Sequence, residues 1–174
     1  MFRKTSLLAV LFIMAFSAVS FAGSGTSSWF DMETCAFCKN MTKNPELLKN
    51  MTWEHYNIAN GIISVTTVNT GYMDAYKEAM GGMGEVEKLM QKGEKVHTCQ
   101  MCAELGDMFT KGAKWEMVET KSGMIGITTA TDPALVTRLQ AWSKRTTDEM
   151  VMMEEASKAE QAKTTGKTTK TKSY

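Results

Sequence analysis

Four cysteines in two CxxC pairs are the residues of this 174-residue chain whose type and spacing could do chemistry. The pairs are Cys35-Ala-Phe-Cys38 and Cys99-Gln-Met-Cys102. Two cysteines three residues apart on a helix lie on one face, about one turn apart. The free N–H groups and the dipole at a helix start favour the thiolate, which is both the nucleophile and the metal ligand. The spacing therefore suits metal binding, thiol–disulfide exchange or disulfide formation.

Metal binding is the chemistry that these cysteines favour most. Four thiolates form a soft ligand set suited to Cu(I) or to tetrahedral Zn²⁺, and we predict a soft-metal site with Cu(I) ahead of Zn²⁺. Two further residues are candidate auxiliary ligands, because one lies inside the second CxxC and the other two residues before it. The predicted ligands are Cys35, Cys38, Cys99, Cys102, His97 and Met101.

Other sulfur-bearing and imidazole side chains fit the interior of a fold better than a site. The chain holds 16 methionines, so it is rich in a flexible residue that fills cores. Met32 and Met41 extend the first CxxC stripe, but the matching positions beside the second CxxC are Val96 and Leu105. Since those residues cannot bind a metal, we expect both methionines to pack in the core. His55 follows Trp53 on the same strand face, and we expect it to be packed or hydrogen-bonded.

Two alternatives use the same four cysteines. A thiol–disulfide redox protein is one, but on a scaffold other than thioredoxin, because a Gly/Ser/Thr-rich stretch rather than a buried strand precedes Cys35. The other is an interaction module stapled by disulfides and without catalysis. Four cysteines allow three pairings, and a bridge between the two CxxC pairs would stabilise the fold by about 4 kcal/mol. The sequence leaves these alternatives open.

Several classes of function are excluded or disfavoured. Lys39 and Ala103 follow the two CxxC pairs where covalent haem attachment requires histidine. We find no nucleotide-binding loop and no Ser-His-Asp set, so the sequence favours a non-catalytic protein without settling whether it is an enzyme. The formal net charge of +1 argues against nucleic-acid binding. The sequence leaves open an unidentified protein partner, and it does not indicate an oligomeric state.

A series of matching residues indicates that the core of the chain is duplicated. Each CxxC is followed by a Trp-Glu pair, then by a Gly-x-Ile triplet, and then by a Thr-Thr pair. The Trp-to-Gly spacing is eight residues and the Gly-to-Thr spacing five in both copies. The markers are Trp53, Gly61 and Thr66 in the first copy and Trp115, Gly123 and Thr128 in the second. We therefore predict two internal repeats, at about 32–95 and 96–156.

Each repeat is predicted to fold as a helix, a β-hairpin and a second helix. We expect each CxxC to open a helix, which in the first copy runs to about Met41. Asn60-Gly61 is typical of a tight hairpin turn, and Asp132-Pro133 of the start of a helix. The apolar stripe of that last helix is Leu135, Leu139 and Trp142. The fold class is thus α+β, with one four-stranded antiparallel sheet covered by helices. Whether the two CxxC segments are neighbours stays open.

The ends of the chain differ from this core. Residues 1–22 combine Arg3 and Lys4, a short apolar run and small residues before a cleavage point after Ala22, which predicts a signal peptide. We therefore expect an exported protein, periplasmic or extracellular, with no membrane span after cleavage. Residues 23–156 would form one globular domain. Residues 157–174 are rich in Lys and Thr, and we expect a disordered tail.

Overall fold

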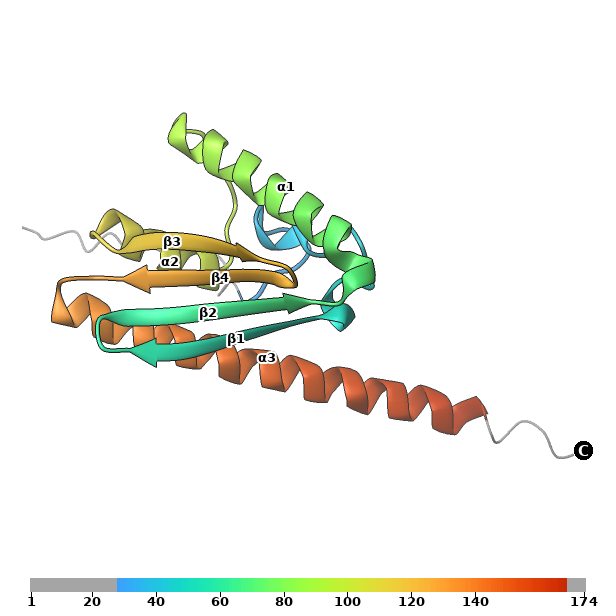
Figure 1. The fold of residues 1–174 in the computed structure, drawn as a ribbon. Coiled ribbons are helices and arrows are strands. Elements are labelled where there is room, and N and C mark those ends of the chain that lie inside the picture. Colours follow the sequence, from blue (N-terminus) through green and yellow to red (C-terminus); the bar gives the residue numbers. More distant parts are fainter. Residues whose placement is uncertain (1–27, 169–174) are drawn as a thin grey trace, which may run out of the picture.

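The computed structural model describes residues 28–168, so the predicted signal peptide, 1–22, lies outside the described residues. The predicted α+β class with a four-stranded antiparallel sheet is confirmed (Figure 1). The strands are β1 (Met51–Ile58), β2 (Gly61–Val68), β3 (Lys114–Thr120) and β4 (Gly123–Thr129). The helices are α1 (Met73–Gln91), α2 (Gln100–Thr110) and α3 (Pro133–Thr168). Three short 3-10 turns are η1 (Cys38–Asn40), η2 (Leu48–Asn50) and η3 (Thr70–Tyr72).

The sheet joins two hairpins through their inner strands. Its order is β1-β2-β4-β3, and every neighbouring pair is antiparallel. Gly61 and Gly123 begin the two inner strands, where a β-carbon on either would collide with a backbone carbonyl of the opposite strand. Gly123 also has φ +147°, which side-chain-bearing residues rarely adopt. Glycine at these two positions therefore lets β2 and β4 approach each other closely.

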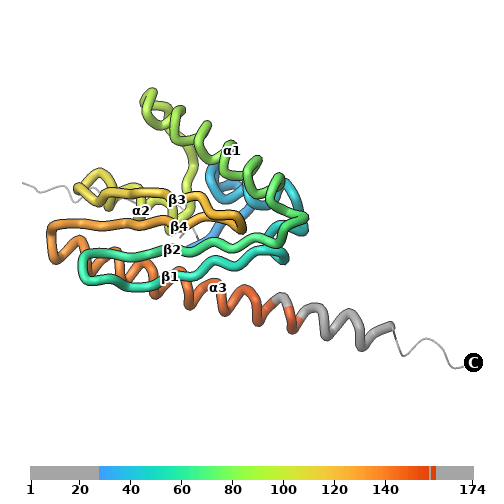
Figure 2. The backbone as a smooth tube through the Cα atoms, viewed as in Figure 1, coloured from blue at the N-terminus to red at the C-terminus, as the bar shows by residue number. Residues whose placement is uncertain are grey.

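The helices are distributed unequally over the two hairpins. α3 packs against β1, β2 and α2, whereas α1 lies beside the β3 edge and rests mainly on the turn η1 (Figures 1 and 2). The predicted stripe of Leu135, Leu139 and Trp142 is buried as α3 crosses the sheet. The Asp132 carboxylate accepts a hydrogen bond from the N–H of Ala134 at 2.9 Å, which caps this helix as expected.

Two apolar clusters stabilise these layers. The larger one lies between the sheet, α2 and α3, and it contains three of the four cysteines. Its buried members include Trp29, Cys35, Cys38, Cys99, Leu139 and Trp142. The smaller cluster lies under α1 and is formed by Leu47, Val68, Tyr76 and Ala79. Met32 packs against the larger cluster and Met41 against the smaller, as a filling role predicts.

The helix predicted from Cys35 to about Met41 is wrong. Turns and the single 3-10 turn η1 occupy this segment instead, and the chain continues through further turns to η2. Asn40, Asn44, Pro45 and Asn50 lie along it, and these residue types compete with helical hydrogen bonding or lack its N–H donor. The second CxxC does open a helix, as predicted.

The proposed duplication and domain limits stay predictions. The two hairpins lie side by side as a doubled unit would place them, but the helical parts differ. In the first half, turns occupy the position that α2 has in the second half. The helices that follow the two hairpins also differ in length, since α1 has 19 residues and α3 has 36. α3 also continues to Thr168, into the segment predicted to be a tail. Within residues 28–168, none of the helices combines the length and apolar character that a membrane span requires.

Candidate metal centre

The second CxxC is held at the start of α2. Cys99 is the N-cap residue in an extended conformation, and Cys102 lies in the first helical turn. The free N–H groups at this helix start donate to the preceding chain, from Gln100 to the carbonyl of Ser28 at 3.4 Å and from Met101 to that of Trp29 at 3.1 Å. Residues 28–29 therefore fasten the beginning of α2 and fix the direction of both cysteines.

The first CxxC is positioned by a loop rather than by a helix. The Asp31 carboxylate accepts hydrogen bonds from the N–H of Glu33 at 3.1 Å, from the N–H of Thr34 at 2.8 Å and from the Thr34 hydroxyl. These bonds hold the pKa of Asp31 well below its ordinary value, the hydroxyl bond being the largest cause. The N–H of Ala36 then donates to the carbonyl of His97 at 2.9 Å, which joins the two cysteine segments.

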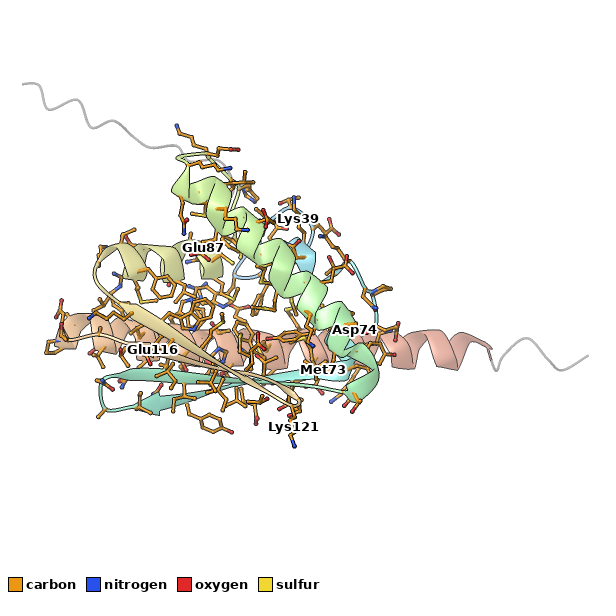
Figure 3. The ribbon with its side chains drawn as sticks, turned by 45° about the horizontal axis from the view of Figure 1, so that its top comes forward. Lys39, Met73, Asp74, Glu87, Glu116 and Lys121 are labelled. Atoms are coloured by element: carbon orange, nitrogen blue, oxygen red, sulfur yellow. The ribbon has the colours of Figure 1, made fainter. Side chains whose placement is uncertain are left out.

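Asn40 closes this loop from the other side. Its side-chain amide is buried and donates to the carbonyls of Ala36 at 2.8 Å and Phe37 at 3.2 Å. Its carbonyl end lies against the backbone of Gly82 in α1, where a β-carbon would stand 2.8 Å from Asn40 Cγ. Figure 3 shows the neighbouring Lys39 beside α1. The loop thus connects the cysteines to α1.

The four cysteine sulfurs meet in one cluster. All four Sγ atoms lie within 4.8 Å of one another, and Cys38 Sγ is 3.6 Å from Cys99 Sγ and 3.7 Å from Cys102 Sγ. A tetrahedral ion with metal–sulfur bonds of about 2.3 Å would place its sulfurs about 3.8 Å apart. Since a disulfide bond is only about 2.0 Å long, these cysteines are free thiols. The cluster therefore has the dimensions of a four-sulfur site for one ion.

Burial and neighbouring charge control how many of the four thiols can ionise. The side chains of Cys35 and Cys99 are completely buried and that of Cys38 is 4% exposed, while Cys102 is partly exposed. Hydrogen bonds from Cys102 and Cys38 hold the pKa of Cys99 far below that of an ordinary thiol. Hydrogen bonds with Cys38 and Cys99, together with burial, raise the pKa of Cys102. Because one thiolate suppresses ionisation of its neighbours, full deprotonation requires a cation among them.

The other two predicted ligands, His97 and Met101, are not part of the group of four cysteines. His97 is not among the four clustered residues; its ring is exposed, with Nε2 3.3 Å from Asp31 Oδ2. Met101 is buried, and its carbonyl accepts a hydrogen bond from Trp142 Nε1 at 3.0 Å. A ligand role for either side chain stays a prediction.

Sequence reasoning overlooked the residues that organise the cluster. Trp29 is buried, and the Arg145 guanidinium lies over its ring at 4.1 Å from the centroid. Asp31, followed three residues later by Thr34, is the one recognisable signal, because this spacing is typical of a side-chain-capped turn. The approach of Asn40 to Gly82 has no local signal, since these residues belong to distant segments.

A second buried polar group lies between aromatic rings. His55 is 4.5 Å from Trp53 and 5.5 Å from Trp142, measured between ring centroids. Both of its ring nitrogens are buried without a hydrogen-bond partner in the described part of the chain. Burial lowers the pKa of His55 to about 4. Packing of this histidine, one of the two predicted options, is therefore confirmed.

Comparison with known proteins gives no functional precedent. No protein-family model matches the chain, and neither a curated protein nor a solved structure shows a significant match. The four clustered cysteines consequently carry the functional argument.

Proposed function

We propose that this chain is an exported protein that binds one metal ion through Cys35, Cys38, Cys99 and Cys102. The observation that supports this proposal is the confinement of all four Sγ atoms within 4.8 Å. Structural zinc sites use four protein ligands and no open position. The ion would join the loop of the first CxxC to the start of α2, so its binding energy would stabilise the fold.

Zn²⁺ is the ion that this arrangement favours, ahead of the Cu(I) that the sequence alone suggested. Four sulfurs at nearly tetrahedral spacing are typical of Zn²⁺ or of iron in a sulfur site. Cu(I) thiolate sites commonly use fewer ligands, so a fourth cysteine sulfur within the same 4.8 Å cluster supports Zn²⁺. A multi-iron cluster would hold its cysteines farther apart, because each sulfur binds a different iron atom.

The burial of the sulfurs supports a retained ion over the two alternatives. A protein that passes its metal or its disulfide to a partner needs an accessible sulfur, but only Cys102 is partly exposed. Cys38 is almost equally distant from Cys99 and Cys102, so the geometry favours no single disulfide pairing. We therefore infer a centre that holds its ion within the fold.

The test is metal analysis of the full chain purified under reducing conditions without added metal. We expect one zinc per chain, four thiols that react only after chelation, and loss of the zinc in Cys38→Ser and Cys99→Ser. Two controls address the auxiliary ligands: His97→Ala and Met101→Leu should retain the ion. Zinc-free protein with four reactive thiols or with two disulfides would contradict the proposal.

Export is tested separately by the mass of the mature protein. Cleavage after Ala22 leaves a chain that begins at Gly23. A cell fractionation in which the intact chain, with its first 22 residues, stays with the cytoplasm would overturn this part of the proposal without affecting the metal site.

A further inference from the structure

A groove between α1 and the outer hairpin is lined by an unusual set of side chains. α1 contributes Met73, Tyr76, Lys77, Met80 and Gly81, and the strands contribute Met117, Glu119, Thr120, Gly123 and Met124. Four of these ten residues are methionines, and none is Leu, Ile, Val or Phe. Figure 3 shows Met73 at the start of α1, near the β3–β4 turn that Lys121 marks. The apolar part of this groove therefore consists largely of thioethers.

Packing accounts for only part of this choice of residue, although Met73, Met80 and Met124 are partly buried against the smaller apolar cluster. On the opposite face of the same sheet, the inner strands carry Ile63, Val65, Ile125 and Ile127, which are typical strand residues. Met117 and Met124 also lie in strands, where β-branched residues would be favoured. Met117 is moreover 51% exposed, so it contributes little to the core. Thioether sulfur is the property that these methionines add.

The backbone places two of the methionines close together on one face of the sheet. Met117 pairs with Gly126 and Met124 with Glu119, so the two methionines are diagonal neighbours on one face of the sheet. Diagonal neighbours lie within reach of long side chains. Met73 and Met80 are seven residues apart, about 10 Å along the axis of α1. One ion would therefore take both strand methionines and a single methionine from the helix.

We propose that this groove is a second metal site, specific for a soft monovalent ion such as Cu(I), with Met117, Met124 and one methionine of α1 as ligands. Thioethers select soft ions and bind Zn²⁺ poorly, so the site would differ in specificity from the cysteine centre. Glu119 lines the same groove and would offset the charge of the ion, while Lys77 lines it from the helix. The proposal is independent of the function proposed for the cysteines.

The test uses silver(I), a redox-inert probe for Cu(I), on the full zinc-treated chain with methyl-labelled methionines. Silver also binds thiolates, so the readout is the methyl resonance of each methionine together with the number of silver ions bound. The groove variant M117L/M124L is compared with M152L/M153L, which removes two exposed methionines of α3. Both variants keep the side-chain volume nearly constant. The single variants M73L and M80L identify the ligand from the helix.

We expect the groove variant to bind one silver ion fewer than the wild-type chain and the α3 variant to bind the same number. In the wild type, the methyl signals of Met117 and Met124 should shift together at the same silver ratio. Equal silver stoichiometry in the two variants, or Met152 and Met153 shifting at the same ratio as the groove, would overturn the proposal. If M117L/M124L unfolds, M117L alone gives the same comparison at an exposed position. Zinc content is measured before silver is added, so failure at either site is distinguishable.

Discussion

The two halves of the chain carry the same sequence markers in different surroundings. Cys99 and Cys102 lie on a regular helix start, whereas Cys35 and Cys38 lie on a turn. Trp53 packs against the core, but Trp115, the matching residue, is 46% exposed. The residues two positions after these tryptophans differ in exposure in the same way. His55 is partly buried, whereas Met117 is exposed.

The cause of this difference is the placement of α3. This helix packs against β1 and β2, so it covers the first hairpin. The outer strand of the second hairpin meets α2 through Trp115 and lines a groove with α1 through Met117. Trp115 consequently stacks on Phe109 of α2 at 6.3 Å between centroids, while Trp53 meets Trp142 of α3 at 6.3 Å. A repeated motif thus predicts a strand or a cysteine pair but not its environment. The following predictions test this contrast.

Removal of the metal should have the largest effect, and it should be confined to one cysteine segment. Chelation is expected to raise amide hydrogen exchange in residues 35–41 by on the order of 100-fold, because short turn hydrogen bonds hold this loop in place of a continuous helical ladder. The later turns of α2 should change far less, since they keep their helical bonds and their contact with α3. Hydrogen exchange measured by mass spectrometry, with and without the chelator, gives the change in each of the two segments. Equal loss of protection in the two segments would contradict the contrast.

The second largest effect should be a difference in stability between alanine variants of the two matched tryptophans. Trp53→Ala is expected to lower the free energy of unfolding by about 3 kcal/mol, because it removes a ring that packs on Trp142 and His55. Trp115→Ala should cost about 1 kcal/mol, mostly the stacking on Phe109. Denaturant unfolding of both variants gives the comparison, and similar losses would show that the two hairpins are equally covered.

His55 should make stability fall as the pH is lowered. Its pKa in the fold is about 4, below the value of about 6.5 expected in the unfolded chain. Between these values the unfolded chain binds a proton that the fold does not, so stability decreases by up to about 3 kcal/mol from pH 6.5 to pH 4. His55→Phe should flatten this part of the profile, whereas His97→Phe, at an exposed position, should leave it in place. A slope unchanged in His55→Phe would contradict the burial of the ring.

Two glycines of α1 should give small effects of opposite sign. Gly82→Ala would push a methyl group into Asn40, and we expect a loss of about 1 to 2 kcal/mol. Gly84→Ala meets no atom within 4 Å, and it should gain about 0.5 to 1 kcal/mol from the better helix propensity of alanine. Thermal unfolding measures both. A gain at both positions would mean that α1 does not rest on the cysteine loop.

The local signals of the sequence account for much of this fold. The Asn60-Gly61 turn, the Asp132 cap and the stripe on α3 were readable because turns, caps and periodicity depend on neighbouring residues. The single four-stranded sheet followed from the two similar hairpins, but its strand order and the meeting of the four sulfurs depend on contacts between distant segments. The helix wrongly expected at Cys35 shows the same limit, because Asp31 and Asn40 stabilise a turn there through bonds that spacing alone does not reveal.

X-ray absorption at the zinc edge, on the full chain purified without added metal, tests the central claim most directly. Our account predicts a single shell of four sulfur atoms at about 2.3 Å from the metal. Ligands of nitrogen or oxygen at about 2.0 Å in place of one or more sulfurs, or a chain without metal, would contradict it.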